Sequence, residues 1–122
     1  MSDVPQSFSE YLAAWNETEP EKVRGHLEQS VAPDVLFIDP ANTTRGIDAL
    51  EAMIVRARRD RPTASYHRTS GIDGHNRRYR YRWAVHVDGQ LALPGMDVAT
   101  VDGEGRIQQV DGFFGDFPVL ET

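Results

Sequence analysis

The stretch GQLALPGMDVATVDGEGRIQQVDGFF (residues 89–114) predicts two β-strands joined by a tight turn. Val98 and Thr100 have branched side chains that favour extended backbone. The tetrapeptide DGEG between the two apolar segments is typical of a turn that joins antiparallel neighbours. We therefore expect strands at 91–102 and 106–114 that pair as a hairpin.

Asp97 is an acidic residue in the middle of the first of these strands. Because successive side chains of a strand point to opposite faces, Asp97 shares its face with Leu93, Ala99 and Val101. An unpaired carboxylate is costly on such an apolar face, whereas a neutral carboxyl is tolerated and can donate a hydrogen bond. We expect Asp97 to line a pocket. The alternative is a structural role, in which a buried arginine or a backbone amide binds the carboxylate.

Apolar residues at helical spacing predict three helices in the first half of the chain. The first two helices begin at capping boxes, which are Ser7 with Glu10 and Thr18 with Glu21. The second helix runs as far as Pro33, because proline cannot continue it. The third helix follows Gly46 and stops at Pro62.

A short strand at 34–39 lies between the second and third predicted helices. After Pro62 the apolar pattern changes to a period of two, which predicts strands at 64–72 and 77–88 ahead of the hairpin. The connecting turns are short, so these strands should form an antiparallel meander. The order of elements predicts a single α+β domain over residues 1–122, with three helices packed on a curved, mainly antiparallel sheet.

The composition is that of a soluble globular protein, with 122 residues, 39% hydrophobic and 26% charged. No apolar segment is long enough to span a bilayer, and the first ten residues lack the basic and apolar segments of an export signal. The absence of cysteine excludes disulfides and thiolate metal sites. We expect a cytoplasmic protein that has no membrane partner.

Arginine is concentrated in the middle of the chain, with nine arginines from Arg56 to Arg82, although the net charge is −6. The segment RRYRYRW (residues 77–83) has the interleaved aromatic residues that stacking on nucleic-acid bases requires. However, alternation of arginine and aromatic residues is typical of a half-buried strand, and the overall negative charge repels phosphate. We expect no nucleic-acid partner. His67 and His75 have no further ligand at metal-binding spacing, so we expect no metal site.

Three segments carry a resemblance to a known family: APDVLFIDP (32–40), RGIDALEAMI (45–54) and the stretch 89–114. They resemble the NTF2-like (cystatin-like cone) superfamily and, more narrowly, its SnoaL-like and ketosteroid-isomerase-like branch. The resemblance extends over nearly the whole chain and implies a cone-shaped sheet that encloses a pocket. The superfamily includes isomerases, cyclases, epoxide hydrolases, dehydratases and non-catalytic modules.

The resemblance also implies two catalytic carboxyl groups. In ketosteroid isomerases the general base is the aspartate of an Asp-Pro pair that ends the first strand, and Asp39 matches it. A second carboxyl, kept protonated, donates a hydrogen bond to the developing oxyanion, and Asp97 matches it. Trp15 occupies the position of the family's oxyanion-hole tyrosine, so Tyr11, one turn earlier, is a candidate substitute. The alternative for Asp39 is a loop-capping role before Pro40.

The remaining candidate pocket residues are aromatic or apolar side chains: Tyr11, Trp15, Phe37, Ile54, Tyr81, Trp83, Val85, Val110 and Phe114. The resemblance implies cofactor-independent acid–base catalysis, of the isomerase or cyclase type, on a small, mainly apolar carbonyl compound. A ligand-binding or dimerisation module is one alternative, and an epoxide-hydrolase- or dehydratase-like enzyme is another. Proteins of this fold commonly pair through the outer face of their last three strands, which implies a homodimer.

Overall fold

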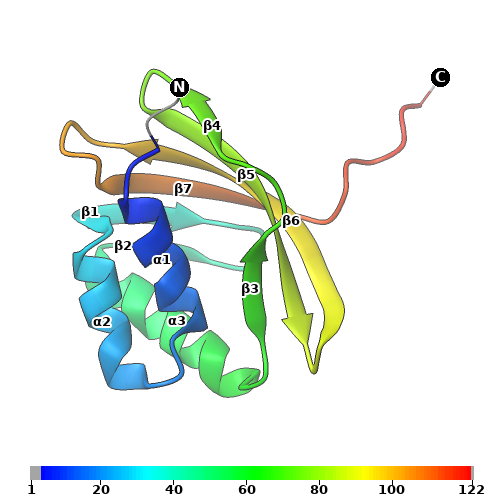
Figure 1. The fold of residues 1–122 in the computed structure, drawn as a ribbon, viewed down its shortest axis with the longest axis horizontal. Helices are drawn as coiled ribbons and strands as arrows, with labels where there is room; N and C mark the ends of the chain where they lie inside the picture. Colours follow the sequence, from blue (N-terminus) through cyan, green and yellow to red (C-terminus); the bar gives the residue numbers. More distant parts are fainter. Residues whose placement is uncertain (1–3, 122) are drawn as a thin grey trace.

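The computed structural model describes residues 4–121, which form a layer of helices on one face of a curved sheet (Figure 1). Within this range the helices are α1 (Ser7–Asn16), α2 (Pro20–Glu28) and α3 (Ile47–Asp60). The strands are β1 (Val31–Ile38), β2 (Thr43–Arg45), β3 (Ser65–Arg68), β4 (Asp73–His75), β5 (Arg78–Val87), β6 (Gln90–Val101) and β7 (Ile107–Phe114). This is the α+β architecture that the sequence predicts.

The strands follow the order β2-β1-β7-β6-β5-β3 across the sheet, and β4 also pairs with β5. Neighbouring strands are antiparallel except β1 and β7, which are parallel. The sheet is therefore mixed but mainly antiparallel. The long strands β5, β6 and β7 form the meander expected from their short turns, and β5 and β6 bend along their length so that one end lies beside β3 (Figure 1).

The predicted hairpin of β6 and β7 is confirmed, and its register places Asp97 opposite Gly112. The carboxylate of Asp102 stabilises the turn, because its Oδ1 accepts hydrogen bonds from the backbone N–H groups of Glu104 and Arg106 at 2.9 and 3.0 Å. Ala99 lies on the same face of β6 as Asp97 and is completely buried. The alternation of the sequence therefore identifies the buried face of β6 correctly.

The strand predicted at 64–72 is interrupted in the structure. Within this range only β3 is a strand, and residues 69–72 separate it from β4, which lies beyond the predicted strand; both β3 and β4 pair with β5. At this break the hydroxyl of Ser70 accepts the backbone N–H of Arg82 at 2.8 Å, where a regular strand would offer a carbonyl. A side-chain acceptor thus replaces one ladder hydrogen bond, and the chain bends between the two short strands.

The prediction that the second helix runs to Pro33 is wrong. Helix α2 ends at Glu28, and Val31 already pairs with Ile107 of β7 at the beginning of β1. The hydroxyl of Ser30 donates to the carbonyl of His26 at 2.8 Å and closes the last turn of the helix. Pro33 is tolerated inside β1 because the β1–β7 register shifts between Val31 and Leu36, where no ladder N–H is needed.

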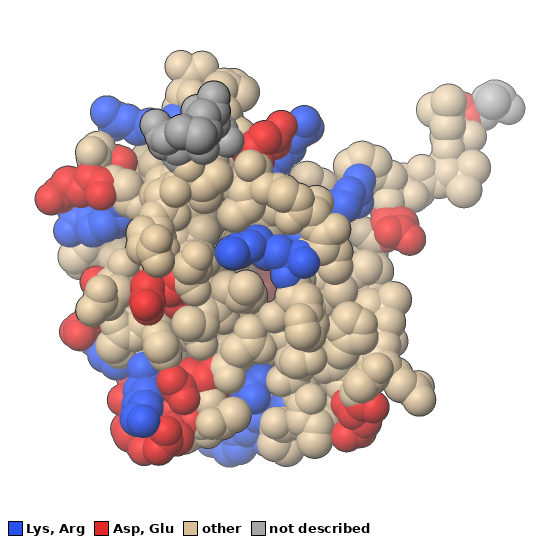
Figure 2. Space-filling view, viewed as in Figure 1, with Lys and Arg blue, Asp and Glu red and all other residues tan. Residues whose placement is uncertain are grey.

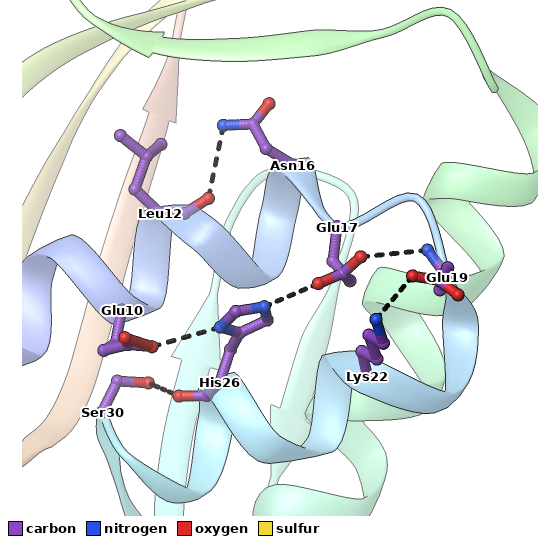
Figure 3. Close-up of polar contacts among 8 residues, drawn as sticks. All are labelled: Glu10, Leu12, Asn16, Glu17, Glu19, Lys22, His26 and Ser30. Carbon is purple, nitrogen blue, oxygen red and sulfur yellow. Dashed lines mark hydrogen bonds and ion pairs between the residues drawn. The ribbon is translucent and has the colours of Figure 1, made fainter.

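Neither predicted capping box forms. The hydroxyl of Ser7 donates to the carbonyl of Gly105 at 2.6 Å, and α2 begins after Glu19 without a side-chain cap. Glu10 has a different partner, since it lies 3.1 Å from Nδ1 of His26, whose Nε2 lies 2.7 Å from Glu17 (Figure 3). Both carboxylates raise the pKa of His26, with Glu17 as the larger cause. The imidazole ring therefore joins α1 to α2.

The hydrophobic core lies between the helical layer and the sheet. Its largest completely buried side chains include Phe8 of α1, Leu27 of α2, Leu50 and Ile54 of α3, and Ile107 of β7. Among the described residues, no helix combines the length and apolarity that crossing a membrane requires. The core fills one end of the space under the helices and leaves the other end to a pocket.

Candidate active site

A pocket of about 420 Å³ lies between α1, α3 and the inner face of the sheet. The lining includes both acids of the sequence prediction, Asp39 and Asp97. It also includes seven of the predicted aromatic and apolar residues, namely Tyr11, Trp15, Phe37, Tyr81, Trp83, Val85 and Phe114. Ile54 and Val110 do not line it. Both are completely buried and belong to the hydrophobic core that packs between the helices and the sheet.

Asp97 is 9% exposed and is held by two donors from the neighbouring strand β5. The hydroxyl of Tyr81 donates to Oδ2 of Asp97 at 2.9 Å, and Nε1 of Trp83 donates to Oδ1 at 2.9 Å. The β5–β6 register places Tyr81 directly opposite Asp97 and Trp83 two residues along the same face. Each carboxyl oxygen therefore has one protein donor, and within residues 4–121 no arginine pairs with Asp97.

Gly95 makes room for the indole ring of Trp83. A Cβ atom at this position would lie 2.3 Å from Cζ2 of Trp83 and 2.4 Å from the carbonyl oxygen of Phe113. Any side chain at residue 95 would displace the ring or the backbone of β7. The glycine is therefore part of the arrangement that allows the indole N–H to reach Asp97.

Burial raises the pKa of Asp97 to about 6. The hydrogen bonds from Tyr81 and Trp83 oppose this rise, whereas the nearby charges of Asp39 and Asp111 contribute to it. The carboxyl group is consequently neutral below that pH and ionised above it. A group of this kind exchanges a proton near neutral pH, which is what acid–base catalysis requires.

Asp39 follows β1 and has the geometry of a loop cap. Its Oδ1 accepts hydrogen bonds from the backbone N–H groups of Ala41 and Asn42 at 2.8 and 2.7 Å, and from the side chain of Asn42 at 3.3 Å. Among the described residues, Oδ2 has no hydrogen-bond donor. Asp39 thus stabilises the β1–β2 turn with one oxygen and lines the pocket at the same time.

Gly112 lies between the two acids. A Cβ atom built on it would lie 3.1 Å from Oδ1 of Asp97 and 3.2 Å from Cβ of Asp39. The absence of a side chain at this position lets both carboxyl groups open into the same space. Asp111, the neighbouring acid of β7, accepts hydrogen bonds from Gln109 and is not part of the lining.

Tyr11 and Trp15 lie on the face of α1 that borders the pocket. The side chain of Tyr11 is 4% exposed, and its hydroxyl has no hydrogen-bond partner within residues 4–121. Burial, followed by the charge of Asp97, raises the pKa of Tyr11 well above its usual value. The indole of Trp15 packs against the rings of Tyr66 and Phe37, with centroids 5.0 and 6.1 Å apart. Tyr11 therefore offers an unused donor, and Trp15 forms part of the wall.

Sequence analysis missed two groups of pocket residues. The first is apolar or aromatic and comprises Phe8, Leu12, Met53, Tyr66 and Leu93. The second is charged and comprises Arg56, Asp60, Arg61 and Arg68. Helical spacing alone places Arg56 and Arg61 near the end of a helix but does not reveal which face borders a cavity. Within residues 4–121 no group of three histidine, aspartate or glutamate side chains could hold a metal ion.

Comparison with protein families identifies this chain. A family model described as the SnoaL-like domain matches residues 8–110. The chain belongs to the SnoaL-like family. A search of curated proteins finds no match to this SnoaL-like protein.

Solved structures agree with this assignment. A protein from Agrobacterium tumefaciens, provisionally described as an isomerase of the SnoaL-like family, has 33% sequence identity and a TM-score of 0.85, covering 90% of this chain and 95% of that one. An NTF2-like protein of unknown function from Exiguobacterium has 18% identity and a TM-score of 0.75, covering 92% and 100%. A protein from Sinorhizobium meliloti, provisionally described as a polyketide cyclase, has 17% identity and a TM-score of 0.71, covering 90% and 95%. The last two similarities show the shared fold.

Proposed function

We propose that this SnoaL-like protein is a cofactor-independent acid–base enzyme, of the isomerase or cyclase type, that acts on a small, mainly apolar carbonyl compound. One observation carries the proposal. Asp39 and Asp97 flank Gly112 and open into one apolar pocket, and among the described residues neither pairs with an arginine. Two carboxyl groups on one cavity are the minimum that a proton shuttle and an oxyanion donor require.

The proposed chemistry begins with proton abstraction by Asp39. Its unoccupied Oδ2 takes a proton from a carbon next to the carbonyl group, and the C–H electron pair moves to form an enolate. At a pH below its pKa of about 6 the carboxyl of Asp97 is neutral and donates a hydrogen bond to the enolate oxygen, which is favourable in a mainly apolar pocket. Asp39 then returns the proton to a carbon atom of the product. The hydroxyl of Tyr11 is positioned as a second donor to the same oxygen.

The relatives support the reaction class without identifying a substrate. The Agrobacterium tumefaciens protein is provisionally described as an isomerase, and the Sinorhizobium meliloti protein as a polyketide cyclase. A double-bond isomerisation and a ring closure through an enolate both begin with removal of a proton from carbon next to a carbonyl group. Both names are therefore consistent with proton transfer at carbon.

A non-catalytic binding module is the competing function, and the geometry of Asp39 favours it. Three donors of the β1–β2 turn bind Oδ1 of Asp39, so a role in stabilising this turn would by itself explain an aspartate at this position. In such a module Asp97 would be a polar contact for a bound ligand. The enzyme and the binding module differ in the effect that Asp39 and Asp97 should each have on the affinity for a bound oxyanion.

Titration with substituted phenols of graded acidity tests the proposal, because a phenolate resembles an enolate in shape and charge. We expect Asp39→Asn to retain or improve phenol affinity, since it removes a negative charge from the pocket. At a pH below the pKa of Asp97, where its carboxyl is a donor, we expect Asp97→Asn to weaken binding, most strongly for the most acidic phenols, because the hydrogen bond from the carboxyl group to the oxyanion is lost. Asp60→Asn, at an exposed acid of the same pocket, is the control. Equal and slight effects of both substitutions would favour the binding module.

We also propose that the protein forms a homodimer through the outer face of β5, β6 and β7. Phe113 projects from this face and is 54% exposed. Met96 and Val98 are only partly buried beside it, and the guanidinium of Arg82 lies 5.4 Å from the ring of Phe117. An apolar patch of this kind on the uncovered side of a sheet is typical of a contact surface.

A further inference from the structure

Three arginine side chains line the mainly apolar pocket, and none of them has an acidic partner. Arg56, Arg61 and Arg68 border the cavity, and within residues 4–121 no ion pair involves any of them. Ion pairs do engage other basic residues, namely Lys22, Arg24, His26, Arg59, Arg80 and Arg106. The charges at the pocket are therefore available to a ligand, and they stand out in a chain whose net charge is −6.

Arg56 lies on the last turns of α3 and Arg61 directly follows the helix, and both border the pocket. Both residues are exposed, and neither side chain forms a hydrogen bond with a described residue. Each guanidinium group has five N–H donors in a planar arrangement that suits a carboxylate. Asp60 also borders the pocket, and its carboxylate lies 4.0 Å from Nε of Arg59, which is not part of the lining.

Arg68 differs from this pair because it is half-buried and already engaged. Its Nη1 donates to the carbonyl oxygen of Phe8 at 3.2 Å, which attaches the side chain to α1. Figure 2 shows Lys and Arg side chains in the middle of one face of the molecule, between α1 and β3. A single engaged guanidinium is a weaker anion site than the two unengaged groups on α3.

Helix α3 and the sheet form opposite walls of the pocket. The helical layer covers the inner face of the sheet (Figure 1), with Arg56 and Arg61 on α3 and Asp97 on β6. Aromatic side chains such as Trp15 and Tyr66 occupy the wall beside them. A ligand that spans this space meets positive charge at the rim, apolar surface along its length, and the carboxyl groups inside.

We propose that the ligand of this pocket is a small amphipathic acid, with an apolar body whose carboxylate binds Arg56 and Arg61 at the rim and whose carbonyl group faces Asp97. This inference rests on the proposed function for the position of the reacting carbonyl. It adds the requirement for an anionic group at the opposite end. The positive charges of Arg56 and Arg61 offset the repulsion that an anionic ligand would otherwise meet from a negatively charged protein.

Two probes of equal size and different charge test the inference, 2-naphthoate and 2-naphthamide, with dissociation constants measured by equilibrium dialysis near neutral pH. Wild-type protein should bind the carboxylate about tenfold more tightly than the amide, as charge-assisted hydrogen bonds allow. The double substitution Arg56→Gln/Arg61→Gln should remove this preference and leave the affinity for the amide unchanged. Arg59→Gln, on the same turn but outside the pocket lining, is the matched control and should preserve the preference.

Several outcomes would overturn the inference. A preference that survives the double substitution, or that falls equally with Arg59→Gln, would show that the two rim arginines do not bind the anion. Loss of the preference in Arg68→Gln alone would place the anion site at Arg68 of β3 instead. Binding of the amide with no preference for the carboxylate would refute this inference only. Failure of wild-type protein to bind either probe would refute the proposed function as well.

Discussion

The indole Nε1 of Trp83 lies 2.9 Å from Oδ1 of Asp97 and donates a hydrogen bond to it across the β5–β6 pair. Sequence alternation places Trp83 on the inner face as a wall residue. The structure gives it a second role, because the same ring that lines the pocket also orients the carboxyl group. Tyr81 binds the other oxygen, so the position of Asp97 is determined from both sides. The first predictions concern this arrangement.

Replacing Asp97 by asparagine should change how stability depends on pH. The pKa of Asp97 rises from 3.8 to about 6 in the folded protein. The native state therefore holds this proton more tightly than the unfolded chain, and wild-type stability falls as the pH rises from about 4 to about 6. At about 1.4 kcal/mol for each pKa unit, the loss is up to about 3 kcal/mol. Asp97→Asn has no carboxyl group at this position, so its stability should not fall in this way as the pH rises.

Urea denaturation of wild type and Asp97→Asn across this pH range measures the difference. The variant should gain stability relative to wild type as the pH rises, and Asp60→Asn, at an exposed acid, is the control. The amide can accept from Trp83 through its oxygen and donate to the hydroxyl of Tyr81, so the fold should be retained. A large loss of stability at every pH would instead indicate an ionised structural partner of Asp97.

Removing either donor should raise the pKa of Asp97 further, because both hydrogen bonds lower it. Tyr81→Phe is the cleaner substitution, since it deletes only the hydroxyl group. Carboxyl ¹³C chemical shifts followed against pH report the titration directly. Tyr66→Phe removes a pocket phenol that does not bind Asp97 and should leave its titration unchanged. An unaltered midpoint in Tyr81→Phe would contradict the hydrogen bond.

Adding one methyl group at Gly112 should separate the two acids. The new Cβ would lie 3.1 Å from Oδ1 of Asp97 and 3.2 Å from Cβ of Asp39, so both must move. We expect Gly112→Ala to cost about 1–3 kcal/mol of stability and to weaken phenol binding. Gly25→Ala, on α2 with nothing within 4 Å of the added Cβ, should stabilise the protein by about 0.5–1 kcal/mol. Unchanged phenol affinity in Gly112→Ala would argue against a shared site.

His26 should give a pH dependence that is lost on replacement by alanine. Glu17 and Glu10 raise the pKa of His26, so the protonated ring stabilises the folded state. This contribution is fully present below the unfolded pKa of about 6.5 and disappears as the pH rises through the folded value. The stability difference between wild type and His26→Ala should therefore shrink with increasing pH. His75→Ala, on exposed β4, provides the comparison.

The homodimer predicts that a charge on the outer face of the sheet dissociates the protein. Phe113→Glu places a carboxylate at an apolar position of this face that is 54% exposed, and it should yield a monomer by sedimentation velocity. Val4→Glu, at a similarly apolar but distant position, should leave the association unchanged. Wild-type protein that sediments as a monomer at micromolar concentration would refute the dimer.

The features of the fold that were predictable from sequence are those that depend on residues close together along the chain. Period-two alternation and the DGEG turn define the β6–β7 hairpin and place Asp97 on the buried face. The break between β3 and β4 was not predictable, because it depends on the hydroxyl of Ser70 bonding to Arg82, twelve residues away. The end of α2 was misjudged for a similar reason, since the pairing of Val31 with β7 overrides its helical spacing.

By itself the sequence determined the order of the three helices and the five longer strands, the family resemblance, and the two acids worth testing, but it did not predict the short strands β2 and β4. Periodicity, turn residues and the Asp-Pro pair are all properties of short segments. Only the tertiary structure decided that Tyr81 and Trp83 bind Asp97, that Gly112 lies between Asp97 and Asp39, and that the rim arginines have no acidic partner. These relationships depend on strand register and on helix–sheet packing, which bring together side chains that are far apart along the chain.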